Sequence, residues 1–380
     1  RRGVRVVAGE GAARTIVVKV GSSTVVGSDG RPDRAFIESL CDQAAELVSR
    51  GMRVVIVSSG AAAAGMGRLG FSKRPTDLAT LQACCSAGQA SLTETYAELL
   101  GEHGIPCGQV LLTRGDVVER ESYLNARGTL STLLDLGAVP VVNENDALSS
   151  SELSFGDNDT LGAIVATLVD ADLYVIMSDI DGLYTANPAD DPTARLIPRV
   201  DHIDAKIMSM AGGAGSSVGT GGMVTKLRAA RAMLAAGIPM AIVRGRREHV
   251  LADVASGEPV GTIFSRPADD PGHESPRKLW IGLAGVPRGT VTVDQGARRA
   301  LVDDGGSLLP VGIIATTGAY AAGDVVSVAD ESGQLLGRGI ARYSSDQLRK
   351  AHGVRLDVIA RFMPELAGQP FIHRDELLLF

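Results

Sequence analysis

Two kinds of hydrophobic pattern alternate between residues 15 and 264. Apolar runs rich in β-branched residues predict six strands, TIVVKV (15–20), RVVIVS (53–58), GQVLLT (108–113), AVPVVN (138–143), DLYVIMS (172–178) and PMAIVRG (239–245). Apolar residues at helical spacing predict intervening helices, one starting at Asp33 and stopped by Gly51. Because the strands are apolar throughout, we expect helices on both faces of an open, mostly parallel α/β sheet.

The pattern changes after residue 264. Residues 265–278 are rich in proline and charge and show no periodicity, which is typical of a linker. Beyond them, short turn-bounded β runs predict a small barrel-like domain over residues 279–365, followed by a C-terminal tail, 366–380. Its predicted elements are the strands LWIGL (279–283), GTVTVD (289–294), GIIAT (312–316), DVVSVAD (324–330) and GRGIARY (337–343), and one helix in 295–305.

Charge and cysteine content narrow the class of protein. The net charge is −7, so no global positive field attracts nucleic acid, and any anion site must be built locally. The four cysteines lack C-x-x-C spacing, and the adjacent pair Cys84 and Cys85 is typical of small core residues in a reducing compartment. No signal peptide or run of about 18 apolar residues is present, so we expect a soluble, cytoplasmic protein.

Polar residues follow four of the predicted strands. In a parallel sheet, ligands bind beyond the carboxyl ends of the strands, so these residues are expected to share one site. They are Lys19 with Gly21, Ser22 and Ser23; Ser58, Ser59 and Gly60; Asn143 to Asp146; and Ser178 with Asp179.

A glycine-rich segment, GTGGMVTK (Gly219–Lys226), opens another predicted helix. Glycines let the backbone approach a phosphate, and a helix N-terminus followed by a lysine attracts one. Taken alone, the segment equally fits a flexible loop with a solvated lysine, and no Walker A motif occurs in the chain. The G-x-G-x-x-G match at Gly65–Gly70 follows a helical alanine run, so it indicates helix termination rather than dinucleotide binding.

Acidic residues gather in FGDND (Phe155–Asp159), just before the predicted helix TLGAIVATLVD. Alone they fit helix capping, but beside the acidic strand end at Asn143–Asp146 they need lysines, a metal ion or a substrate ammonium as partners. Lysines and acids without a histidine or cysteine dyad favour phosphoryl transfer to an acceptor that needs no general base. A carboxylate is such an acceptor, because its reference pKa is about 4.3.

These motifs together resemble the glutamate 5-kinase family of the amino-acid-kinase superfamily. The motifs that carry the resemblance are VVKVGSS, VIVSSGA, VPVVNENDA, FGDND, SDIDGLY and GTGGMVTK. The resemblance implies that residues 1–264 form the catalytic domain. Residues 279–365 resemble a PUA domain through LWIG, GTVTVD and GSLLPVGI. The chain departs from the family pattern at Leu81 and at Cys84-Cys85, which we expect to affect local packing or regulation.

The resemblance implies transfer of the ATP γ-phosphate to the γ-carboxylate of L-glutamate, giving L-glutamyl 5-phosphate in the first step of proline biosynthesis, with Mg²⁺ accompanying the nucleotide. It implies that Lys19 and Lys226 neutralise the transferring group and that Asp159 orients both. We expect phosphate oxygens and water, rather than named side chains, to be the main ligands of the metal. The residues implied to bind glutamate are Ser59, Asp146, Asp157 and Asn158, and those implied to contact ATP are Lys19, Gly21, Ser22, Ser178, Asp179, Thr220, Gly221, Gly222, Met223, Val224, Thr225 and Lys226.

The resemblance also implies a homo-oligomer and feedback inhibition by proline. RNA binding by the PUA-like domain is disfavoured, because acids are interspersed among its arginines and no aromatic-rich basic stripe is present. Two rivals remain to be tested: a superfamily kinase with another acceptor, such as acetylglutamate, aspartate, carbamate or a nucleoside monophosphate, and an RNA-binding protein with an inactive kinase-like domain.

Overall fold

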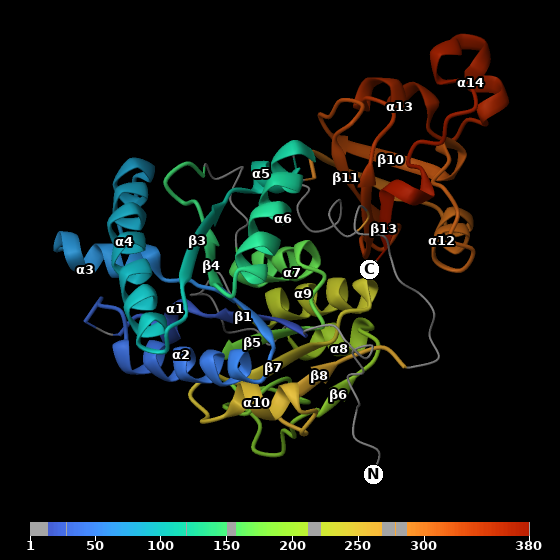
Figure 1. Cartoon of the computed structure of the whole chain (residues 1–380). Helices are drawn as coiled ribbons and strands as arrows, with labels where there is room; N and C mark the ends of the chain where they lie inside the picture. Colours follow the sequence, from blue (N-terminus) through green and yellow to red (C-terminus); the bar gives the residue numbers. More distant parts are fainter. Residues whose placement is uncertain are drawn as a thin grey trace. The chain divides into compact units, whose positions relative to one another are not determined.

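The structure is a computed structural model that describes residues 14–27, 29–118, 120–149, 157–211, 222–267, 278 and 287–379 (Figure 1). The chain divides into two compact units, Arg1–Gly272 and His273–Phe380. The predicted strand LWIGL lies outside the described residues.

An eight-stranded sheet forms the centre of the first unit, in the order β3-β4-β2-β1-β5-β7-β8-β6. All six predicted strands are present, and every neighbouring pair is parallel except β7 and β8. Two further strands, β6 and β8, are too short to show a periodic pattern in the sequence. The bounds are β1 Thr15–Val20, β2 Arg53–Val57, β3 Cys107–Leu112, β4 Val139–Glu144, β5 Leu173–Ser178, β6 Arg199–Val200, β7 Met240–Arg244 and β8 Thr262–Phe264.

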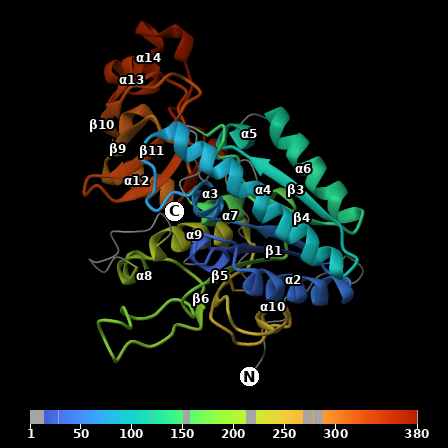
Figure 2. The ribbon, with the colours of Figure 1, turned by 90° about the vertical axis from the view of Figure 1, so that its left-hand side faces the viewer.

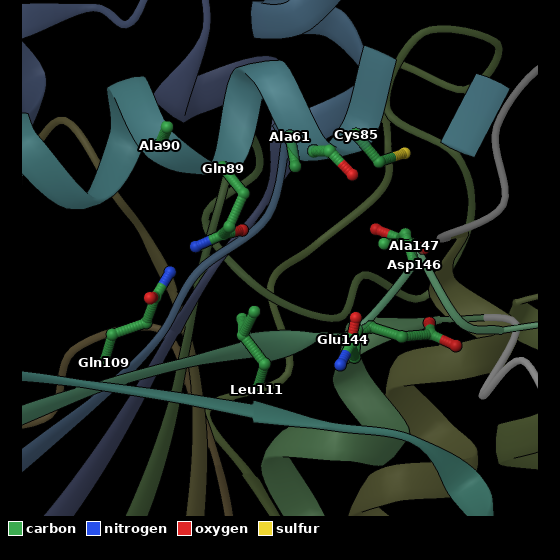
Figure 3. Close-up of a pocket in the computed structure, with 11 residues that line it drawn as sticks. Ala61, Cys85, Gln89, Ala90, Gln109, Leu111, Glu144, Asp146 and Ala147 are labelled. Atoms are coloured by element: carbon green, nitrogen blue, oxygen red, sulfur yellow. The ribbon is translucent and has the colours of Figure 1, made fainter. Parts of the chain in front are cut away.

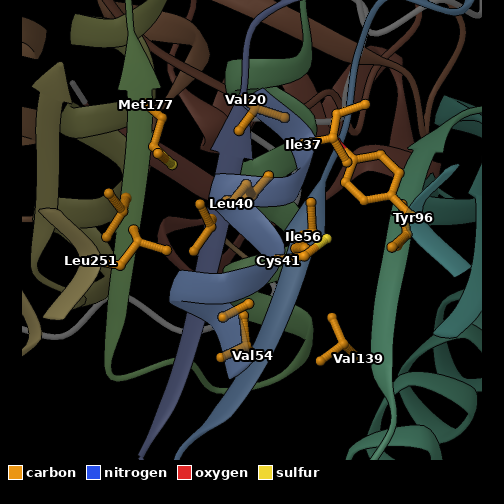
Figure 4. Close-up of a cluster of buried hydrophobic side chains, with 14 of the residues drawn as sticks. Val20, Ile37, Leu40, Cys41, Val54, Ile56, Tyr96, Val139, Met177 and Leu251 are labelled. Atoms are coloured by element: carbon orange, nitrogen blue, oxygen red, sulfur yellow. The ribbon is translucent and has the colours of Figure 1, made fainter. Parts of the chain in front are cut away.

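Helices cover both faces of this sheet, which confirms the predicted α/β architecture (Figures 1 and 2). Strand side chains such as Val18 and Ile56 pack with α2, α4 and α10 in one buried cluster, part of which Figure 4 shows. Helices α7 and α9 pack on the other face. The helices are α1 Ser22–Val25, α2 Arg34–Ser49, α3 Ala61–Leu69, α4 Leu78–Glu102, α5 Arg114–Val118, α6 Arg120–Asp135, α7 Asn158–Leu168, α8 Ala205–Met210, α9 Met223–Ala236 and α10 Val250–Ala255.

Helices α3 and α4 cross in close contact because each presents a glycine to the other. A Cβ atom on Gly65 would lie 1.7 Å from the carbonyl oxygen of Cys84, and one on Gly88 would lie 1.9 Å from that of Ala61. Gly65 and Gly67 of the Gly65–Gly70 motif thus lie within helix α3, and Gly70 ends it in the left-handed conformation, as predicted. This contact fixes α3, which follows directly on Ser59 and Gly60.

We expect Gly88→Ala to destabilise the first unit by about 1–3 kcal/mol, because the added methyl group must push two backbones apart. Gly128→Ala is the matched control, since Gly128 is also helical but a Cβ atom added there would meet nothing within 4 Å. The control should gain about 0.5–1 kcal/mol from helix propensity. Urea unfolding of both variants measures the difference, and equal stabilities would contradict the close packing.

The second unit contains a five-stranded sheet in the order β10-β9-β11-β12-β13, with β9 and β11 parallel and the other pairs antiparallel. Its core joins Val291, Val328 and Phe371 with helix residues such as Leu348 and Ile359. The bounds are β9 Gly289–Val293, α12 Gln295–Val302, β10 Ile313–Gly318, β11 Val325–Asp330, β12 Leu335–Ile340, α13 Ser345–Ala351, α14 Leu356–Phe362 and β13 Leu377–Leu379.

Two features of the second unit were not expected from the sequence. Helices α13 and α14 follow β12, and the segment 366–380, expected to be a tail, contributes β13 as the fifth strand of the sheet. Across both units, none of the helices in the described ranges combines the length and apolarity that a membrane span requires.

Candidate active site

The carboxyl ends of β1, β2, β4 and β5 open into one cavity of about 550 Å³. The sequence places polar residues at all four ends, and the parallel register brings them to the same edge. The cavity is lined by Lys19, Gly21, Ser22, Ser23, Thr24, Ser59, Gly60, Ala61, Ala62, Ala63, Arg74, Leu81, Cys85, Asn143, Glu144, Asp146, Asp157, Asn158, Met177, Ser178, Asp179 and Lys226.

Two lysines from distant parts of the chain share one carboxylate beside this cavity. The Nζ atom of Lys19 lies 2.7 Å from Oδ1 of Asp159, and that of Lys226 lies 3.4 Å from Oδ2. The Thr225 hydroxyl donates to the same Oδ2 at 2.7 Å. Asp159 is fully buried, whereas both lysines reach the cavity wall. Lys226 is therefore a buried, paired lysine rather than a solvated one.

The protonation of Asp159 follows from these contacts. Burial alone would raise the pKa of its carboxyl group, but the Lys19 and Lys226 ammoniums outweigh burial and lower the pKa below its usual value. The ionised carboxylate holds two ammoniums at the cavity wall, where they suit an incoming phosphate.

The N-terminus of helix α7 supplies three consecutive site residues. Asp157 is the N-cap, and its carboxylate accepts hydrogen bonds from the backbone N–H and the hydroxyl of Thr160 at 2.7 and 3.1 Å. The capping interpretation is therefore right for Asp157, which also lines the cavity. Burial raises the pKa of its carboxyl group. Tyr174 donates to the Asp159 carbonyl at 2.9 Å, which fixes the first turn of the helix to β5.

Asn158 connects the ends of β2 and β4. Its Nδ2 atom donates to the Ser58 carbonyl at 2.6 Å, to Oγ of Ser59 at 2.8 Å and to Oδ1 of Asn143 at 2.9 Å. Ser59 and Asn143 are buried, and Asn158 lines the cavity. The strand ends are thus held together by side-chain amide hydrogen bonds, in addition to the sheet itself.

Asp146 lines the same cavity in an acidic environment. Burial and the nearby Glu144 carboxylate raise the pKa of Asp146 to about 6. The Cys85 thiol hydrogen-bonds to this carboxylate, and burial raises the pKa of that thiol to about 12. Leu81 and Cys85, two of the positions that depart from the family pattern, both line the cavity.

The cysteines otherwise serve packing. All four are free thiols; Cys41, Cys84 and Cys85 are buried, and Cys107 is partly buried. Burial raises the pKa of Cys41 to about 12 and that of Cys107 to about 11, so these thiols stay protonated at neutral pH. The prediction that Cys84 and Cys85 are core residues is confirmed.

The remaining predicted ATP contacts fall into three groups. Ser178 and Asp179 line the cavity, and the serine hydroxyl donates to the aspartate at 3.0 Å. Gly222 is the N-cap of α9 and Met223, Val224 and Thr225 form its first turn; they are near Lys226 in sequence but are not among the described lining residues. Thr220 and Gly221 lie outside the described residues.

Several site residues escape sequence reasoning. The sequence indicates Asn143 and Glu144 only as a polar strand end, and Arg74 and Gln89 give no signal at all. Gln89 lies in the middle of the 25-residue helix α4, where a polar residue usually faces solvent, yet it is buried and accepts a hydrogen bond from Asn143 at 2.7 Å. Only its contact with a distant strand reveals this role.

A metal ion would find few protein ligands here. Within the described part of the chain, no three His, Cys, Asp or Glu side chains are grouped so that they could hold one. Asp159, the most buried acid, is already occupied by two lysines. This donor set would fit a divalent cation whose main ligands are phosphate oxygens and water, and Asp179 is an exposed carboxylate that lines the cavity.

In the second unit, arginines pair with acids. Arg298 lies 3.7 Å from Asp330, and Arg342 lies 3.2 Å from Glu376. These pairs partly neutralise the positive charge that phosphate contacts would use.

Comparison with known proteins gives matches for both units. A model of the amino acid kinase family matches residues 14–244, and a model of the PUA domain matches residues 289–362. A glutamate 5-kinase of Anaeromyxobacter dehalogenans (strain 2CP-C) is 45% identical over 369 residues, covering 96% of this chain and 96% of the relative. One of Bifidobacterium adolescentis is 44% identical over 369 residues, covering 97% and 96%.

Proposed function

The chain belongs to the amino acid kinase family and, within it, to the glutamate 5-kinases, and on this premise we propose how its residues carry out the reaction. It uses ATP to phosphorylate the γ-carboxylate of L-glutamate, giving L-glutamyl 5-phosphate in the first step of proline biosynthesis. The observation that carries the mechanism is the pairing of Lys19 and Lys226 with one buried carboxylate at a cavity wall.

In the transfer, a γ-carboxylate oxygen of glutamate forms a bond to the γ-phosphorus while the bond from that phosphorus to the ADP oxygen breaks. Lys19 and Lys226 neutralise the negative charge on the transferring group and on the leaving oxygen. Asp159 holds both ammoniums in place. No general base is needed, because the acceptor is already ionised at neutral pH.

Glutamate is held by residues from three other elements around the cavity. Ser59, Asp157 and Asn158 come from the end of β2 and the start of α7, and Asp146 follows β4. The carboxylates of Asp146 and Asp157 attract the substrate ammonium, and this attraction directs the γ-carboxylate toward the lysines.

The nucleotide would lie across the ends of β1 and β5, with Gly21 and Ser22 beside its phosphates and Ser178 and Asp179 farther along. The N-terminus of α9, which begins at Met223, would face the phosphates with the backbone N–H groups at the start of its first turn. Mg²⁺ bound to ATP supplies further neutralisation of phosphate charge.

The test is ADP release with Mg-ATP against a panel of acceptors, with hydroxylamine present to trap an acyl phosphate as a hydroxamate. The panel contains glutamate, aspartate, acetylglutamate, carbamate and a nucleoside monophosphate. We expect hydroxamate only with glutamate. ADP release that does not depend on glutamate would contradict the proposal, and salt-sensitive RNA binding without turnover would favour the RNA-binding alternative.

The rate should depend on pH through Asp146. The pKa of this carboxyl group is raised to about 6, so below that pH the group is protonated and cannot hold the substrate ammonium. We expect kcat/KM for glutamate to fall about tenfold per pH unit below this value, with KM for ATP much less affected. In the Asp146→Asn variant, kcat/KM for glutamate should no longer fall in this way as the pH is lowered. A profile that is flat from pH 5 to 7 in the unmodified protein would contradict the assignment.

We further propose that the protein is cytoplasmic, forms a homo-oligomer and is inhibited by proline. These proposals follow from membership in the family, and sedimentation velocity and proline titration of the glutamate-dependent rate test the last two. For the PUA domain we propose a structural or regulatory role, which the pairing of Arg298 and Arg342 with acids supports.

A further inference from the structure

A chain of side-chain hydrogen bonds runs from helix α4 to the substrate cavity. Nδ2 of Asn143 donates to Oε1 of Gln89 at 2.7 Å, and Nδ2 of Asn158 donates to Oδ1 of Asn143 at 2.9 Å. Gln89 and Asn143 are 8% and 2% exposed, so water cannot easily replace either partner. The chain ends at Asn158, which lines the cavity.

Backbone groups fix the directions of the Asn143 and Asn158 amides. The Glu144 backbone N–H donates to Oδ1 of Asn143 at 2.9 Å, so that atom must be the oxygen. The Ser58 carbonyl accepts from Nδ2 of Asn158 at 2.6 Å, so that atom must be the nitrogen. Neither amide can turn over without placing two donors or two acceptors against each other.

The other end is fixed in the same way. The Thr93 hydroxyl donates to the Gln89 carbonyl at 2.9 Å, so its oxygen can only accept from the Gln89 amide, at 3.1 Å, and from the Gln109 amide, at 2.8 Å. Oε1 of Gln89 is thereby turned toward Asn143. Figure 3 shows Gln89 and Gln109 pointing toward each other in a second cavity of about 280 Å³, with Glu144 and Asp146 across from them.

We propose that Gln89 is a positioning residue for the acceptor substrate. By accepting from Nδ2 of Asn143, it holds the Asn143 side chain in place, so that Oδ1 of Asn143 can receive Nδ2 of Asn158 and Oδ1 of Asn158 remains the amide atom available to a ligand. An amide oxygen accepts a hydrogen bond from an ammonium group, whereas an amide nitrogen would repel one. The chain of amides thus selects for the α-ammonium of the substrate. This inference rests on the proposed binding of glutamate at Asn158.

Gln89→Met tests the inference, because methionine has a similar length but offers no comparable acceptor. Nδ2 of Asn143 is then buried without a partner, so we expect the Asn143 side chain to shift and to hold Asn158 less firmly. We expect KM for glutamate to rise about tenfold, with kcat and KM for ATP changed less than about twofold. The inhibition constant of glutarate, which matches glutamate but lacks the ammonium, should stay unchanged.

Gln109→Leu is the matched control. Gln109 is exposed and donates to the same threonine but makes no bond to Asn143, so its loss should leave KM for glutamate unchanged. Thr93→Val provides a second test that leaves Gln89 in place: it frees the Gln89 amide to turn and should raise KM for glutamate in the same direction by a smaller factor.

Three results with the Gln89→Met variant would overturn the inference. The first is an unchanged KM for glutamate, and the second is an equal rise in the inhibition constant of glutarate. The third is an equal change in KM for ATP, which would indicate a general disruption of the site. If the unmodified protein releases ADP without any dependence on glutamate, the proposed function itself fails, whatever the variants do. The glutamate-dependent rate of the unmodified protein therefore separates the two failures.

Discussion

Lys226→Met should lower kcat about 10³-fold while KM for glutamate changes little. The ammonium of Lys226 meets the negative charge of the transferring phosphoryl group, so its loss is felt mainly in the transition state. Methionine has nearly the length of lysine and fills the same buried space, and Asp159 keeps Lys19 as a partner at 2.7 Å. The fold should therefore survive, and steady-state kinetics with a thermal melt measure both effects.

Lys206→Met is the matched control, since Lys206 is exposed on helix α8. It should retain the kcat of the unmodified protein. Lys226→Arg keeps the charge, but its planar group does not match the compact ammonium contact with Asp159, so an intermediate loss is expected. A Lys226→Met variant with an unchanged kcat would remove this lysine from the mechanism.

The position of the site could be predicted from the sequence because it depends on strand direction. Lys19, Ser59 and Asp179 each lie at the end of an apolar run, and parallel pairing brings the ends of such runs together. The phosphate interpretation of Gly219–Lys226 depended on its place before a helix. Naming glutamate as the acceptor required the resemblance at NENDA and FGDND, because paired acids alone fit several substrates.

The contacts within the site could not be predicted. Nothing local in the sequence shows that Lys226 is buried against Asp159, 67 residues away, or that Gln89 accepts from a strand residue 54 positions later. Strands β6 and β8 were missed because two or three residues carry no period. Such features follow from packing between distant segments, which sequence periodicity does not record.

Asp159→Asn should affect both catalysis and stability. The substitution removes the carboxylate charge that both buried lysines contact, so we expect kcat to fall at least 10²-fold and the free energy of unfolding to fall by about 3 kcal/mol at pH 7. Asp170→Asn is the control, because Asp170 pairs with Arg127 at 2.6 Å on the surface and should change stability by less than about 1 kcal/mol.

The pH dependence of this loss distinguishes an ion pair from simple packing. The pKa of Asp159 is lowered in the folded protein, so its ionised form stabilises the fold at pH values above the unfolded pKa, about 3.9. That stabilisation disappears as the pH falls through the folded value. The difference in unfolding free energy between the unmodified protein and Asp159→Asn should therefore shrink as urea titrations move from pH 7 toward pH 3. A difference that stays constant over this range would mean that Asp159 stabilises the fold through packing and not through its ionic interaction with Lys19 and Lys226.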